Sequence, residues 1–129
     1  MKPIRVVCGI IWNARKVFIA RRKPEKNLGG FWEFPGGKLE PDEDSILAIQ
    51  RELHEEFGMN ISNIRFFSSH IHEYETFAIE LLSYECEFES ASFLLTDHDD
   101  YVFVRIEELT GFKIAPADKF IVTTLMNAL

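Results

Sequence analysis

The alternation of apolar runs with turn residues along the chain predicts a set of β-strands. Five runs are rich in β-branched and aromatic residues, as strands are: Arg5–Trp12, Lys16–Arg21, Ile64–Ser68, Phe77–Phe88 and Tyr101–Arg105. The first run (RVVCGIIW) is apolar without interruption, which is typical of a buried strand. The turn Asn13–Arg15 separates it from the second run, so the two are predicted to form a hairpin. Residues 22–31 contain one Pro and two Gly, which favours a loop, and residues 32–37 form a short extended piece ending in a Gly-Gly turn.

Two segments follow a helical period instead. The clearer one runs from Pro41 to Phe57, with Gly58 as its C-terminal stop. Its apolar stripe, spaced for one helix face, is Ile46, Ile49, Leu53 and Phe57. The other begins at Pro116 and ends near Ala128, with four apolar residues predicted to face inward: Phe120, Ile121, Leu125 and Leu129. The order of elements, strand pair, loop, helix, strands and closing helix, predicts a mixed α/β (α+β) fold.

Length and composition limit the class of protein. The chain has 129 residues, the size of one domain, and we expect residues 1–129 to form a single domain. Apolar residues make up 47% and charged residues 27%, which excludes wholesale disorder. No apolar run approaches the ~18 residues of a membrane span, and the first residues lack a secretory segment. We therefore expect a cytoplasmic protein without a membrane partner. Cys8 and Cys86 are predicted to be buried small hydrophobic residues, with a disulfide as the alternative.

Charge is distributed unevenly along the chain. The formal net charge is −7, which argues against duplex nucleic acid as a partner. Residues 1–38 hold nine Lys or Arg and two acidic residues, whereas residues 39–129 hold five and nineteen. Seven acidic residues lie between Glu40 and Glu56. A basic half beside an acidic half suits a polyanionic small molecule that arrives with a divalent cation.

Three glutamates within the first predicted helix carry the candidate chemistry. Glu52, Glu55 and Glu56 stand at i, i+3 and i+4, which places them on one helix face, roughly opposite the apolar stripe. Like charges this close repel each other, so helix stability alone does not favour them. Carboxylate clusters are the ligands that Mg²⁺ and Mn²⁺ prefer. The alternative is a solvated acidic face.

The surrounding residues identify a longer motif. Residues 37–59, GKLEPDEDSILAIQRELHEEFGM, resemble the Nudix box, G-x5-E-x7-R-E-U-x-E-E-x-G-U with U apolar, and fill every specified position. The flanking segments FWEFPGGKLEPDE and IAPAD resemble the MutT-type branch, and most of all its CTP pyrophosphohydrolases. The resemblance implies the Nudix fold, in which a mixed sheet is sandwiched between helices.

The resemblance also implies an activity. Water would attack a nucleoside triphosphate with the help of Mg²⁺ or Mn²⁺ and release the monophosphate and pyrophosphate, which sanitises the nucleotide pool. The substrate would be an oxidised purine triphosphate such as 8-oxo-dGTP or a cytidine-type triphosphate. Two alternatives stay open: hydrolysis of another nucleoside diphosphate derivative, or a non-catalytic Nudix domain that senses a nucleotide. The oligomeric state is not predicted.

Roles within the box follow from its residues. Gly36 and Gly37 permit close approach of the backbone to a metal or phosphate. We expect Arg51 to pair with Glu43 and to hold the loop onto the helix. The predicted metal ligands are Gly37, Glu52, Glu55, Glu56 and Asp97, the last by its position ahead of the strand Tyr101–Arg105. One of the glutamates, or an acid from another loop, would accept the proton of the water. Asp97 within TDHDD is alternatively part of a plain solvated turn, and we interpret His98 as a loop residue.

Substrate contacts are predicted at both ends of the expected cleft. Lys38 and one of Arg21 and Arg22 would bind phosphates; successive residues of a strand point to opposite faces, and we favour Arg22. Phe34, Phe77 and Leu81 would line the base pocket, with simple core packing as the alternative.

Asp118 is the residue from which we predict base selection. Oxidised-guanine MutT enzymes resemble the segment Ala115–Asp118 but carry Asn at the position of Asp118. An ionised Asp offers acceptors only, which favours a base edge rich in donors, such as the cytosine amine or N1–H and N2–H of guanine. The alternative role of Asp118 is to cap the closing helix.

Overall fold

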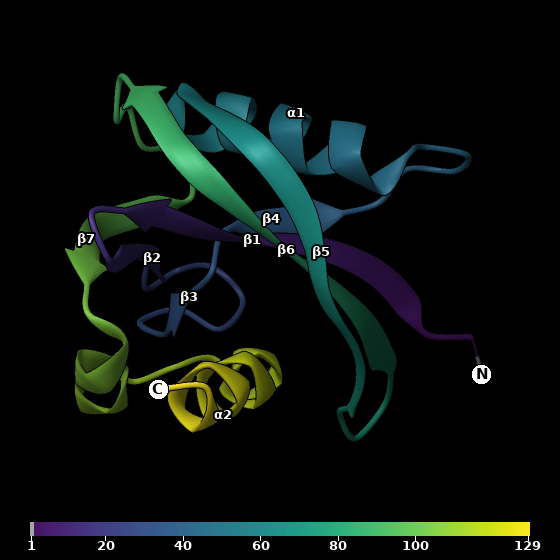
Figure 1. Cartoon of the computed structure of the whole chain (residues 1–129). Helices are drawn as coiled ribbons and strands as arrows, with labels where there is room; N and C mark the ends of the chain where they lie inside the picture. The colour runs from purple at the N-terminus through teal and green to yellow at the C-terminus, as the bar shows by residue number, and fades with distance from the viewer. Residues whose placement is uncertain (1) are drawn as a thin grey trace.

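The computed structural model describes residues 2–129, which form one mixed sheet with a helix against each face (Figure 1). The strands are β1 (Ile4–Asn13), β2 (Lys16–Arg22), β3 (Trp32–Glu33), β4 (Gly36–Lys38), β5 (Met59–Glu73), β6 (Ala78–Ala91) and β7 (His98–Val104). The helices are α1 (Ser45–Phe57) and α2 (Lys119–Asn127), with 3₁₀ turns η1 (Ile106–Gly111) and η2 (Pro116–Asp118) before α2. The predicted mixed α+β fold is confirmed.

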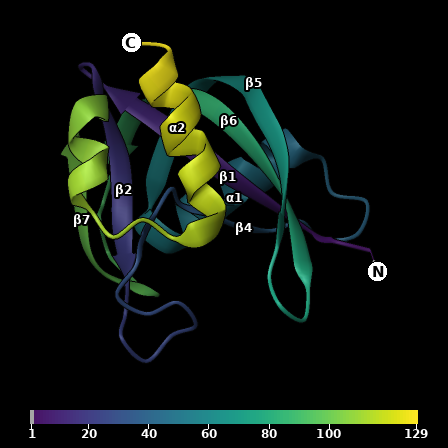
Figure 2. The same cartoon turned by 90° about the horizontal axis from the view of Figure 1, so that it is seen from below.

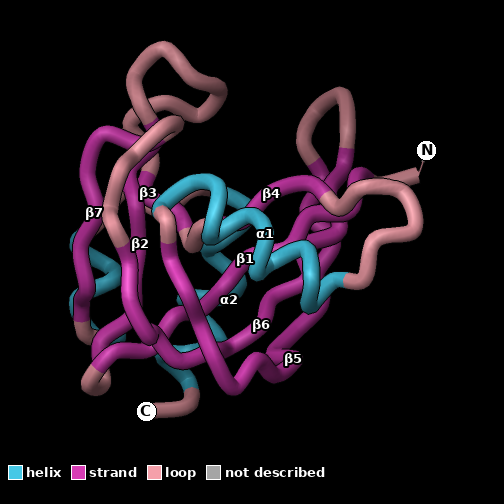
Figure 3. The backbone as a smooth tube through the Cα atoms, turned by 90° about the horizontal axis from the view of Figure 1, so that it is seen from above, coloured by secondary structure: helices cyan, strands magenta, loops and turns pink. Residues whose placement is uncertain are grey.

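The sheet has the order β3-β2-β1-β6-β5, with β4 also paired to β1 and β7 to β2. β1 runs parallel to β6, and all other pairs are antiparallel. Helix α2 crosses one face of the sheet in the view from below (Figure 2), and α1 covers the opposite face in the view from above (Figure 3).

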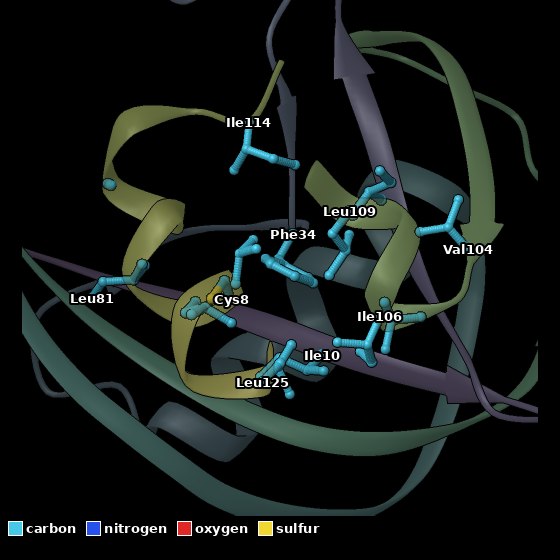
Figure 4. Close-up of a cluster of buried hydrophobic side chains, with 14 residues drawn as sticks. Cys8, Ile10, Phe34, Leu81, Val104, Ile106, Leu109, Ile114 and Leu125 are labelled. Carbon is cyan, nitrogen blue, oxygen red and sulfur yellow. The ribbon is translucent and has the colours of Figure 1, made fainter. Parts of the chain in front are cut away.

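β1 divides the core into two halves because its side chains alternate between the two faces. Val7 and Ile11 pack under α1 with Phe57, whereas Cys8 and Ile10 pack on the α2 side (Figure 4). This burial on both faces explains the uninterrupted apolar run in the sequence. Cys8 and Cys86 are both buried and free, as predicted.

Helix α1 begins four residues later than the sequence pattern predicts. Asp44 caps it, with its carboxylate accepting the N–H groups of Ile46 and Leu47, both at 3.1 Å. Residues 41–44 form a turn instead, in which Asp42 has a φ of 61°. Ile46 at the first turn of the helix is 39% exposed, so its predicted place in the buried stripe is wrong. Ile49, Leu53 and Phe57 are fully buried.

Two further predictions are wrong: the length of the strand β5 and the inward-facing residues of the closing helix. β5 spans 15 residues although only Ile64–Ser68 are predicted as a strand, because backbone pairing with β6 keeps even its polar residues extended. In the closing helix, Phe120 and Leu129 are 40% and 74% exposed and do not face inward. Only Ile121 and Leu125 of the four predicted residues enter the core.

Candidate active site

The site begins where β4 meets α1. A Cβ atom on Gly36 would lie 1.8 Å from the Val7 carbonyl oxygen, so only glycine allows β4 to approach β1. A Cβ on Gly37 would lie 2.4 Å from the Glu52 carboxyl carbon. The glycine pair therefore has two separate purposes: Gly36 closes the sheet, and Gly37 makes room for a carboxylate over the strand.

Arg51 organises the acidic residues around it. Its Nε and Nη2 donate to the two carboxylate oxygens of Glu43 at 2.8 and 2.9 Å, which confirms the predicted pair. Glu43 also accepts the Glu40 N–H at 3.0 Å, and its pKa is lowered to about 2, first by Arg51. The same guanidinium donates to Glu52 at 3.1 Å and to Glu55 at 3.4 Å. Arg51 thus fixes the loop before α1 and the orientation of two of the three glutamates.

The three glutamates differ sharply in exposure. The side chain of Glu55 is 60% exposed and that of Glu52 is 15% exposed, whereas Glu56 is buried, with 8% of the residue exposed. The prediction that all three glutamates lie roughly opposite the apolar stripe is therefore wrong for Glu56, which lies at the edge of the core. Its carboxylate oxygen Oε2 is buried and has no hydrogen-bond partner among residues 2–129.

Burial dominates the electrostatics of these carboxylates. It raises the pKa of Glu56 to about 9, and the charges of Glu52, Glu33 and Asp97 add to the rise. Burial also raises the pKa of Glu52, against the opposing effect of Arg51. A carboxyl group reaches such a pKa where burial disfavours its charged form and neighbouring carboxylates repel that charge.

The charge of Asp97 contributes to the raised pKa of Glu56, and its side chain pairs with Lys26 at 3.2 Å. Across the described part of the chain, no three acidic, His or Cys side chains are already gathered at metal-binding distances. The contacts of Arg51 with Glu52 and Glu55 explain part of this, because they engage oxygens that a cation would use.

A cavity of about 170 Å³ extends from Gly37. Its lining includes six residues predicted to bind metal or substrate: Arg22, Phe34, Gly37, Lys38, Leu81 and Asp118. Phe34 and Leu81 belong to the core on the α2 side of the sheet, with Leu81 on β6 (Figure 4).

Two predicted substrate residues lie outside this cavity. Phe77 stacks on Tyr74, with ring centroids 4.8 Å apart, and lines an adjoining cavity of about 430 Å³. Arg21 donates to Asp99 at 2.8 Å and lies over the Trp32 ring. The register of β2 with β7 shifts between Arg21 and Arg22, and it is Arg22 that reaches the cavity, as we favoured.

Asp118 occupies the N-cap position of α2, but its side chain does not cap the helix, so the alternative of a capping role is wrong. Its side chain makes no capping bond; it accepts the backbone N–H of Phe34 at 2.8 Å. Asp118 is 6% exposed, and burial, with a contribution from the Glu33 charge, raises its pKa to about 8. The raised pKa favours the protonated acid near neutral pH, which carries an O–H donor, so the predicted acceptor-only carboxylate forms only at higher pH.

Sequence reasoning missed two residues of the cavity region, Glu33 and His98. Glu33 lines the cavity, and its carboxylate accepts a hydrogen bond of 2.7 Å from His98. The interpretation of His98 as a loop residue is wrong, because its side chain is completely buried at the start of β7. The only sequence signal was the polar residue within the apolar segment FWEF, since the partners lie 65 positions apart and nothing in the sequence indicates their pairing.

Comparison with known proteins agrees with this architecture. The sequence profile of the NUDIX domain matches residues 6–124. The CTP pyrophosphohydrolase of Escherichia coli is 35% identical over 118 residues, which cover 92% of this chain and 87% of that protein. The 8-oxo-dGTP diphosphatase of Proteus vulgaris is 39% identical over 74 residues, 57% of this chain and 66% of that protein. The solution structure of the E. coli ORF135 protein superposes with a TM-score of 0.83 at 33% identity, covering 98% of this chain and 91% of that one.

The chain therefore belongs to the NUDIX domain family and is a Nudix hydrolase. Within residues 2–129, no helix is long and apolar enough to span a membrane.

Proposed function

We propose that the protein hydrolyses a nucleoside triphosphate to the monophosphate and pyrophosphate in a reaction that depends on Mg²⁺ or Mn²⁺. The observation that carries the proposal is the buried carboxylate of Glu56, whose Oε2 atom lacks a partner in the described chain. The charge of Glu52 raises the pKa of Glu56, and the charge of Arg22 lowers it. Carboxylates for a cation thus adjoin a cavity whose lining includes the cationic residues Arg22 and Lys38.

The residues present fit a divalent cation. An orphaned buried carboxylate oxygen, a second carboxylate admitted only by a glycine, and an all-oxygen donor set are what Mg²⁺ and Mn²⁺ require. The cation would be held by the predicted set: Glu52, Glu55, Glu56, Asp97 and the backbone at Gly37. When bound, such an ion neutralises phosphate charge and lowers the pKa of a nearby water.

The protein residues would then divide the remaining work. Arg22 and Lys38 would bind the phosphates and hold the triphosphate group along the cavity. In the reaction, the oxygen of water bonds to a phosphorus atom, the anhydride bond between the α- and β-phosphates breaks, and pyrophosphate leaves. One glutamate of the box, or Asp97, would accept the proton that the water loses. Arg51, engaged by Glu43, would keep Glu52 and Glu55 oriented.

The base would lie at the Asp118 end of the cavity, between Phe34 and Leu81. Two relatives suggest two substrates, because one is named a CTP pyrophosphohydrolase and the other an 8-oxo-dGTP diphosphatase. Above pH 8, where Asp118 is ionised and offers acceptors only, an Asp rather than an Asn at position 118 favours a cytidine-type triphosphate. A nucleotide sensor without activity is less well supported, since Glu52, Glu55 and Glu56 are all present. A cytoplasmic location stays a prediction.

Release of pyrophosphate tests the proposal. The purified protein is assayed with Mg²⁺ at pH about 9 on dCTP, 5-methyl-dCTP, dGTP and 8-oxo-dGTP. We expect turnover of at least one nucleotide, and Glu56→Gln should lower kcat by about 10²–10⁴-fold while the fold is kept. Glu107→Gln, at an exposed position in η1, is the matched control and should behave as wild type.

Two results would contradict the proposal. One is the absence of pyrophosphate release from every nucleotide despite folded protein. The other is full activity of Glu56→Gln, which would remove this carboxylate from the reaction.

A further inference from the structure

The buried His98 holds a carboxylate of the substrate cavity from outside that cavity. Its Nε2 lies 2.7 Å from Oε2 of Glu33, and its ring packs against Phe57 with centroids 5.0 Å apart. The His98 side chain is 0% exposed, whereas that of Glu33 is 18% exposed and lines the cavity. The substrate could therefore contact Glu33 but not His98.

The surroundings of the ring select one form of the imidazole. Glu33 accepts a hydrogen bond from Arg22 as well, which is the role of a carboxylate acceptor. Nε2 of His98 must therefore carry the hydrogen that is donated to Glu33. Nδ1 of His98 is buried and meets no hydrogen-bond partner within residues 2–129. A bare lone pair there is less costly than an unpaired N–H. Nε2 of His98 is thus a fixed donor to the Glu33 carboxylate.

Arg22 is a weaker anchor for Glu33. Its Nη1 lies 3.4 Å from Glu33 Oε2, and its Nε donates to the Asn27 carbonyl oxygen at 2.8 Å. Arg22 also lines the cavity in which we place the phosphates. A guanidinium that turns to a phosphate can no longer hold Glu33, and His98 is then the donor that remains.

Glu33 lies between the two functional ends of the site. Its charge contributes to the raised pKa of Glu56 at one end and to that of Asp118 at the other. The next residue, Phe34, donates its N–H to Asp118, so that donor is already used. Glu33 and Asp118 both line the cavity, and the Glu33 charge is close enough to raise the pKa of Asp118.

We propose that His98 is a positioning residue that fixes Glu33 as a second hydrogen-bond acceptor for the base, beside Asp118. The inference rests on the proposed function and deepens it, because it defines the substrate class as nucleotides whose base edge presents more than one donor. His98 contacts neither base nor phosphate and acts only through Glu33.

The test compares His98→Phe with His98→Gln. The Phe ring preserves packing on Phe57 but removes the donor, and we expect the KM for the preferred nucleoside triphosphate to rise about tenfold with kcat within about threefold. The KM for ribose 5-triphosphate, which has no base, should rise less than twofold. Gln retains an N–H donor and should restore most of the loss.

Phe103→Leu serves as a stability control, since Phe103 lies on the same strand and packs in the same half of the core. It should lower Tm without changing the ratio of the two KM values. Equal rises of both KM values in His98→Phe, wild-type values in that variant, or no rescue by Gln would overturn the positioning role. Inactive wild-type protein on all nucleotides would instead overturn the proposed function.

Discussion

At the scale of single residues, burial rather than residue type distinguishes the functional carboxylates. Glu55 and Glu56 are neighbours in the sequence, yet only Glu56 is withdrawn from water, and its pKa is raised to about 9. Asp118 has no acidic neighbour in the sequence, and burial raises its pKa to about 8. A carboxyl group in such surroundings changes its hydrogen-bonding role within the working range of pH.

Asp118→Asn tests the role of this residue in base selection. Above pH 8 the ionised Asp118 offers acceptors only, whereas Asn offers one donor and one acceptor at every pH. At pH 9 we expect wild type to prefer a cytidine triphosphate and the variant to shift towards 8-oxo-dGTP by about tenfold in kcat/KM. Initial rates of pyrophosphate release at several concentrations of each nucleotide measure this shift.

The same measurement at pH 6.5 is an internal control. Protonated Asp118 carries a donor, as Asn does, so the difference in nucleotide preference between wild type and Asp118→Asn should become smaller. If wild type already prefers 8-oxo-dGTP and the variant leaves that preference intact, Asp118 acts only as the acceptor for Phe34 N–H.

At the scale of elements, the contact between β4 and α1 sets the position of the metal-binding carboxylates. β4 has three residues and pairs with β1 through Val7↔Gly37 and Cys8↔Gly36. α1 is held over it by Arg51, which links Glu43 before the helix to Glu52 within it. A short strand and one guanidinium thus fix the height of the helix above the sheet.

Substitution of the two glycines should separate folding from function. Gly37→Ala places a methyl group against the movable Glu52 carboxylate, so we expect near wild-type Tm but a loss of kcat of about tenfold or more. Gly36→Ala places it against the Val7 backbone, which cannot move aside, and should lower Tm strongly. Thermal melts and activity assays on both variants distinguish these effects, and equal loss of Tm in the two would contradict the assignment.

At the scale of the whole molecule, the site reduces the stability of the fold. Glu56 and Asp118 both have a higher pKa in the folded protein than in the unfolded chain, where ordinary values near 4.5 and 3.8 apply. Between those values and about 9, the folded state binds more protons than the unfolded state. Stability therefore falls as pH rises through this range.

Thermal melts from pH 5 to pH 9 test this linkage. Without divalent cations we expect Tm to fall as pH rises, with each group contributing at most about 1.4 kcal/mol per pH unit. Glu56→Gln should flatten the profile. Mg²⁺ should raise the Tm of wild type more at pH 9 than at pH 6, because it binds the ionised carboxylates, and should do much less in Glu56→Gln. A Tm that is independent of pH and of Mg²⁺ would contradict both the raised pKa of Glu56 and the metal site.

Local patterns predicted much of this architecture correctly. The apolar run of β1, the helical stripe of α1 and its Gly58 stop involve neighbouring residues, whose conformations depend on one another directly. The start of α1 was predicted too early because Asp44, not Pro41, satisfies the free N–H groups of the first turn. The length of β5 was missed because pairing with β6, rather than its own apolar pattern, keeps it extended.

The sequence by itself determined the box, its Glu43–Arg51 pair and its three glutamates, since these lie within the 23 residues of 37–59 and follow from local geometry. Only the tertiary structure decided which carboxylates are buried, that Arg22 rather than Arg21 enters the cavity, and that Asp118 accepts from Phe34. It also joined His98 to Glu33. The His98–Glu33 and Asp118–Phe34 contacts join residues that are separated by 65 and 84 positions in the sequence. Sheet pairing and core packing bring these residues together. Solvent exposure, which sets a pKa, exists only once the whole chain has folded.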